Sequence, residues 1–168
     1  YDECEVCNGP GAIYECGCEG LPDFDGDFGS TIWDPAGECG LNNSADYEFN
    51  GSMTFKIYPN GYEAGSIGDK IAIFHNGELR GVGCASEVPV FLGNGISFIT
   101  MVYSNEIDAG EELTFRYYDQ SENVIYDVFS EEGWDDDNDP ETPNTYNFTS
   151  NMIIGDVTDP LQLTFNPD

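Results

Sequence analysis

Residues 69–83 read DKIAIFHNGELRGVG, and this stretch is the most informative one for predicting the fold. Two runs rich in β-branched and aromatic residues flank Asn76-Gly77, a dipeptide typical of a two-residue type I′ β-hairpin. The register of such a hairpin places Phe74 opposite Leu79. The stretch therefore predicts two antiparallel strands joined by a tight turn.

Similar short runs continue on both sides of this hairpin, separated by Gly, Asn, Asp and Pro. In SMTFKIY (residues 52–58) and ELTFRYY (112–118), apolar residues alternate with polar ones, which predicts one inward face per strand. SFITMVY (97–103) is apolar on both faces, as expected of a buried central strand. A second hairpin is predicted from ELTFRYY into NVIYDVF (123–129). The expected inward residues are Met53, Phe55, Ile57, Leu113, Phe115 and Tyr117.

This pattern predicts an all-β domain over residues 46–168. We expect an antiparallel β-sandwich of about seven or eight strands, either immunoglobulin-like or jelly-roll-like. Residues 1–45 differ, because they contain five of the six cysteines and show no sustained apolar periodicity. They are predicted to form a Cys/Gly/Asp-rich, loop-like arm that depends on cross-links and ions for its order.

The charge balance narrows the range of partners. Four Lys and Arg residues against 33 Asp and Glu residues give a formal net charge of −29. Such a chain repels phosphate backbones and anionic lipid, so neither nucleic acid nor membrane insertion is expected. The chain is still 39% hydrophobic and 14% aromatic, which is enough to build a core. Divalent cations are the expected counterions.

The cysteine content indicates an oxidising compartment, and we expect an extracellular, secreted or cell-surface protein. The chain opens without a basic, apolar signal segment, which we interpret as a mature product or a fragment. Cys4, Cys7, Cys16 and Cys18 are compatible with a four-thiolate zinc site, but disulfides suit export better. We expect Cys16 and Cys18 each to bond to Cys4 or Cys7, and the remaining pair to be Cys39–Cys84.

Two acidic clusters are candidate calcium sites, with solvated loops as the alternative. The first places three carboxylates at alternate positions, followed by an acid where an EF-hand loop would close. The second packs four carboxylates and an amide into five consecutive positions, where they repel one another unless a cation lies among them. The predicted ligands are Asp23, Asp25, Asp27 and Asp34 in the first cluster, and Asp135, Asp136, Asp137, Asn138 and Asp139 in the second.

Three sequons predict N-glycosylation at Asn42, Asn50 and Asn147, although an Asn- and Ser-rich chain also produces such triplets by chance. The single histidine, His75, is expected to form a surface charge pair with Glu78 across the hairpin. No nucleophile elbow, phosphate loop or paired-histidine zinc motif accompanies it. We therefore expect no enzymatic activity.

The run ECEVCNGPGAIYECGCEG (residues 3–20) resembles the Cys/Gly/Asp spacers of exported proteins from Bacteroidetes-type bacteria. GDKIAIFHNGELRGVG, ELTFRYYDQSENVIYDV and SNMIIGDVTDPLQLTF resemble the β-sandwich modules of the same surface and fibril-forming proteins. The resemblance implies an extracellular adhesive, filamentous or cell-wall role, sometimes beside carbohydrate-binding modules. It carries no active-site residue over to this chain.

Two functions follow as hypotheses. The first is a protomer of an extracellular fibre, stabilised by calcium and disulfides, that assembles head to tail through an exchanged arm. The alternative is a carbohydrate-binding or adhesion module of a larger secreted protein. Its ligand would be a polysaccharide held by exposed aromatic residues, for which the candidates are Trp33, Tyr58, Tyr62 and Trp134.

Overall fold

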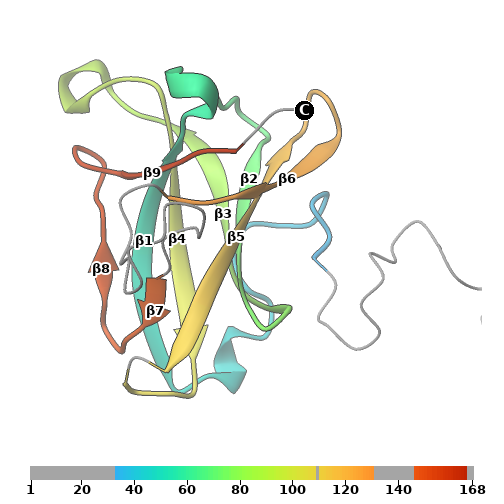
Figure 1. Ribbon diagram of the computed structural model, residues 1–168, viewed down its shortest axis with the longest axis vertical. Helices are drawn as coiled ribbons and strands as arrows, with labels where there is room; N and C mark the ends of the chain where they lie inside the picture. The colour runs from blue at the N-terminus through green and yellow to red at the C-terminus, as the bar shows by residue number, and fades with distance from the viewer. Residues whose placement is uncertain (1–32, 109, 131–145, 166–168) are drawn as a thin grey trace, which may run out of the picture.

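The computed structural model describes residues 33–108, 110–130 and 146–165. These residues form nine β-strands in one mixed sheet, with one short 3-10 turn before the first strand and two between later strands (Figure 1). The strands are β1 (Phe49–Ile57), β2 (Lys70–His75), β3 (Glu78–Glu87), β4 (Ile96–Ser104), β5 (Glu111–Asp119), β6 (Val124–Val128), β7 (Tyr146–Phe148), β8 (Ile153–Ile154) and β9 (Leu161–Leu163). The 3-10 turns are η1 (Ser44–Asp46), η2 (Pro59–Gly61) and η3 (Val90–Leu92). No helix within these ranges is long and apolar enough to cross a membrane.

The sheet order is β6-β5-β2-β3-β4-β1-β8, with β7 also paired to β5 and β9 also paired to β1. The all-β prediction is confirmed, but the purely antiparallel arrangement is wrong, because β8 and β9 both run parallel to β1. The cause lies in the turn after β7. Strand β7 pairs with β5, and residues 149–152 then carry the chain across to β1, where Ser52 N–H donates to the Met152 carbonyl at 2.9 Å.

The two ends of the sheet approach each other around one core. Phe129, after β6, forms a two-bond antiparallel bridge with Thr164, after β9, at N–O distances of 3.0 and 2.8 Å. The main hydrophobic cluster lies on the inner side, with side chains from β1, β2, β4, β5, β6, β7 and β9. Burial of this apolar surface is the dominant favourable contribution to folding.

The central hairpin has the predicted register, with Phe74 opposite Leu79. Asn76 and Gly77 have φ angles of 47° and 79°, both positive as a type I′ turn requires. One feature was not predicted. The register shifts between Ile73 and Phe74, so that Arg80 is an extra residue on β3. Such a β-bulge changes the direction of a side chain relative to the regular alternation.

The predicted inward residues of β1 and β5 are all buried. For β4 the prediction was wrong on one face, because Ile99 is 55% and Met101 42% exposed on the outer side. Conversely, Lys56 on the polar side of β1 is buried, since its ammonium donates to Glu63 Oε2 at 3.0 Å and to the Asn94 carbonyl at 2.7 Å.

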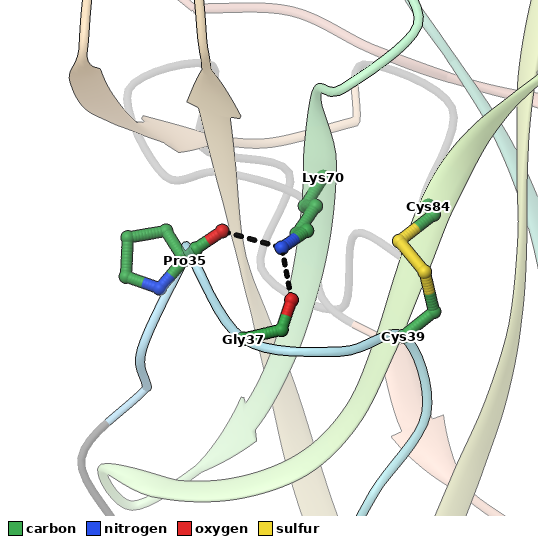
Figure 2. The surroundings of a disulfide bond; sticks show 5 residues. All are labelled: Pro35, Gly37, Cys39, Lys70 and Cys84. Atoms are coloured by element: carbon green, nitrogen blue, oxygen red, sulfur yellow. Dashed lines mark hydrogen bonds between the residues drawn. A yellow bond between two sulfur atoms is a disulfide. The ribbon is translucent and has the colours of Figure 1, made fainter.

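A second, smaller apolar cluster lies beneath residues 33–43, which we call the strap. Trp33 and Leu41 of the strap pack with Ala72, Phe74, Leu79, Val82 and Tyr118 from β2, β3 and β5. The strap contains the predicted Cys39–Cys84 disulfide, with a Cα–Cα distance of 5.6 Å. Figure 2 shows the Lys70 ammonium beside this disulfide, donating to the carbonyl oxygens of Pro35 and Gly37. The strap is thus held by a covalent bond, a buried cation and an indole ring.

Candidate functional site

An open pocket of about 430 Å³ lies at the end of the sheet that carries η2 and the β5–β6 hairpin. Three segments far apart in sequence form its walls: the β1–β2 connection, the β5–β6 hairpin, and Phe165, two residues after β9. Figure 1 shows η2 and this hairpin at the same end of the molecule. The lining side chains used below are Tyr62, Asp69, Asp119, Glu122, Tyr126 and Phe165.

Aromatic rings form the apolar part of the pocket. Tyr126 and Phe165 stack with their centroids 4.2 Å apart and their planes 20° from parallel. Tyr117 lies behind both, with centroids 6.3 Å from Tyr126 and 6.0 Å from Phe165. Tyr62 stands at the rim with 80% of its surface exposed. Phe165 itself is only 8% exposed, so the aromatic surface available to a ligand is that of Tyr62 and of the half-buried Tyr126.

The carboxylate of Asp69 joins two of these walls, the β1–β2 connection and the β5–β6 hairpin. Its Oδ2 accepts hydrogen bonds from Ser66 N–H and from the Tyr117 hydroxyl, both at 2.7 Å, and its Oδ1 accepts from Gln120 N–H at 3.0 Å. Asp69 is only 2% exposed, so these bonds replace its hydration. Burial, followed by the bond to Asp69, raises the pKa of the Tyr117 hydroxyl, which therefore stays a donor.

The β5–β6 turn supplies the polar rim. Asp119 Oδ1 accepts from Ser121 N–H at 2.8 Å, the Ser121 hydroxyl at 2.7 Å and Glu122 N–H at 3.1 Å, an arrangement typical of an Asp-initiated turn. The Tyr126 hydroxyl donates to Glu122 Oε2 at 3.0 Å, which orients the ring and raises the pKa of that hydroxyl. These hydrogen bonds orient the side chains of the rim without a bound ligand.

The predicted calcium ligands fall largely outside the described residues. Asp23, Asp25, Asp27 and residues 135–139 all lie there. Asp34 is described and exposed, and its Oδ1 accepts Ala36 N–H at 2.8 Å within a turn of the strap. Across 33–108, 110–130 and 146–165, no three His, Cys, Asp or Glu side chains form a group that could hold a metal.

His75 does lie opposite Glu78, as predicted, but its contacts differ from the expected charge pair. Its Nε2 is 3.8 Å from Glu111 Oε1, and its Nδ1 is 2.8 Å from the Glu112 carbonyl oxygen. Glu78 instead contacts Arg80 at 3.4 Å.

Of the remaining predicted sites, Asn42, Asn50 and Asn147 are all exposed, so each sequon is accessible. Cys4, Cys7, Cys16 and Cys18 lie outside the described residues. Among the aromatic candidates, Trp33 is only 6% exposed and packs edge-on against Phe74 and Tyr118, so its ring is not available to bind a ligand. Tyr58 donates to Glu63 at 3.3 Å, and Trp134 is not described.

The sequence pointed to Tyr62 alone among the pocket residues. Asp69, Tyr126 and Phe165 were missed, because no local pattern brings them together. Searches of protein-family models, curated proteins and solved structures return no match. The pocket is therefore interpreted from its own geometry.

Proposed function

We propose that this chain is an extracellular, non-catalytic module that binds a polysaccharide, with one or two sugar units seated in the aromatic pocket. The observation that carries the proposal is a pocket in which the rings of Tyr62 and Tyr126 lie with the carboxylates of Asp119 and Glu122. A pyranose ring has apolar C–H faces and a polar edge. Aromatic faces complement the former, and hydrogen-bond acceptors complement the latter.

The size and openness of the pocket agree with this ligand. About 430 Å³ lies within the usual range for small-ligand sites. The pocket is open to solvent, so a longer chain can continue past Tyr62 in either direction. The Tyr126 ring is held by its hydrogen bond to Glu122 and by its stacking on Phe165, which reduces the ordering entropy lost on binding.

Location and fold type belong to the same proposal. The Cys39–Cys84 bond supports an oxidising, extracellular setting. The core cluster, filled from β1 and β4 on one side and β2 and β5 on the other, supports a sandwich-like arrangement of the curved sheet.

We propose no catalysis because His75 and Asp69 lie at opposite ends of β2, so the histidine is remote from the pocket.

Head-to-tail fibre assembly stays a prediction. It requires an arm that leaves its own domain, and the strap packs on its own sheet through Trp33, Leu41 and Cys39. Any exchanged segment would thus come from residues 1–32, which are not described. Imaging of the purified chain for filaments, with and without chelator, tests that prediction separately.

Calorimetric titration with neutral gluco-, xylo-, manno- and N-acetylchito-oligosaccharides tests the binding proposal. Tyr62→Ala is expected to weaken binding about two- to tenfold, because an aromatic contact contributes about 0.5–1.5 kcal/mol. Phe91→Ala is the matched control, since Phe91 is 84% exposed and does not line the pocket. Absence of binding to every oligosaccharide, or equal losses in both variants, would contradict the proposal.

A further inference from the structure

We propose that the aromatic pocket selects a protonated amine on its ligand, so that its preferred saccharides are amino sugars with a free amino group. This inference rests on the proposed function, because it names the ligand class of the same pocket.

The charges that line the pocket are all of one sign. Asp69, Asp119 and Glu122 contribute carboxylates, and no Lys, Arg or His is among the described lining residues. The chain has only four Lys and Arg residues, and each is engaged elsewhere: Lys56 with Glu63, Lys70 with the strap, Arg80 with Glu111, and Arg116 with Asp127. Sulfated or uronic sugars are thus repelled, and a cationic ligand is attracted.

Each of the two rim carboxylates has one oxygen that can still accept a hydrogen bond. Asp119 forms its turn bonds through Oδ1, and Glu122 bonds Tyr126 through Oε2. Within the described part of the chain, no donor is assigned to Asp119 Oδ2 or Glu122 Oε1. By contrast, both oxygens of Asp69 already accept hydrogen bonds inside the wall. An ammonium group would therefore be held by Asp119 and Glu122, with charge-assisted hydrogen bonds to the second oxygen of each.

The aromatic rings favour the same ligand. An ammonium group near the face of a tyrosine is attracted by the ring quadrupole. Tyr62 and Tyr126 belong to the same pocket as the two rim carboxylates. A neutral N-acetyl group would contact the rings but would not be attracted by the carboxylates of Asp119 and Glu122. A protonated amine makes both interactions and is therefore expected to bind more tightly.

The test compares two matched ligands by calorimetry in the presence of EDTA. One is a β-1,4-linked glucosamine tetramer, and the other is its fully N-acetylated counterpart. Mildly acidic buffer keeps the glucosamine amines protonated. The free-amine tetramer is expected to bind about five- to tenfold more tightly. Glu122→Gln and Asp119→Asn are expected to remove that preference, and both keep an acceptor for the local hydrogen bonds.

Glu112→Gln is the matched control, because it removes one exposed carboxylate from the start of β5, away from the pocket. It is expected to keep the preference. Equal binding of the two tetramers would overturn the amine proposal and leave the polysaccharide proposal standing. Binding of neither would overturn both. A preference that survives Glu122→Gln and Asp119→Asn would mean general attraction to an acidic surface, and would overturn this site.

Discussion

Arg80 on β3 and Glu111 on β5 form a bidentate ion pair across the intervening strand β2. The Nη1–Oε2 and Nη2–Oε1 distances are both 2.8 Å. Both residues are buried, and the guanidinium also lies 5.1 Å from the centroid of the Tyr47 ring. Arg80 also donates to the Tyr103 carbonyl at 3.1 Å, and Glu111 Oε2 also accepts from the Ser104 hydroxyl. Removing one partner would leave a buried charge without compensation.

Arg80→Met is expected to lower the free energy of unfolding by about 3–5 kcal/mol, because Glu111 then stays buried without its cation. Arg116→Met is the control. Arg116 contacts Asp127 at 3.1 Å, but the side chains are 41% and 89% exposed, so the expected loss is below about 1 kcal/mol. Urea denaturation of both variants measures the two losses, and similar values would show that the buried pair has no special role.

Acid should weaken this same pair. Burial raises the pKa of the Glu111 carboxyl, but the hydrogen bonds from Arg80 and Ser104 together lower it further, so the net shift is downward. A lowered pKa stabilises the folded state above the usual glutamate value of about 4.3 and loses that contribution as pH falls through the folded pKa.

The measurement compares wild type with Glu111→Gln in denaturation series at successive pH values. The stability difference is expected to be full at neutral pH and to shrink in acid. Using a difference cancels the relief of repulsion among the other acidic groups, which both proteins share. A difference that stays constant down to strongly acidic pH would contradict the expected linkage.

Loss of the Cys39–Cys84 bond should free the strap. The two cysteines are 45 residues apart, and closing a loop of that length corresponds to about 4 kcal/mol of stability in the chain-entropy description. Cys39→Ser/Cys84→Ser is expected to lose roughly that amount and to shift tryptophan fluorescence to longer wavelength as Trp33 meets water. Reductant should destabilise wild type more than the double variant, and equal responses would exclude this bond as the stabilising one.

Calcium is expected to raise the melting temperature through the acidic clusters at residues 23–27 and 135–139. A ligand at 100 times its dissociation constant stabilises by about 2.7 kcal/mol per site. Asp25→Asn/Asp27→Asn and Asp135→Asn/Asp137→Asn should each reduce the shift seen by scanning calorimetry. Glu106→Gln/Glu112→Gln removes the same charge elsewhere and should leave the shift intact. A melting temperature indifferent to chelator at low salt would identify both clusters as solvated loops.

Much of the local structure followed from the sequence alone. The Asn76-Gly77 turn, the Phe74–Leu79 register and the inward faces of β1 and β5 depend on residues within about five positions of one another, where steric and periodic rules act directly. The same holds for the hairpin between β5 and β6. These features required no knowledge of the rest of the chain.

Tertiary structure alone decided the remainder. The parallel pairing of β8 and β9 with β1, and the meeting of Asp69, Tyr126 and Phe165, join segments whose contacts depend on how the whole sheet curves. The bulge at Arg80 likewise reflects a one-residue register shift between strands. Lys56 and Lys70 are buried although lysine is normally exposed, because carbonyl and carboxylate groups from distant segments replace water around each ammonium. Such choices are made by competition among long-range pairings, which local pattern does not encode.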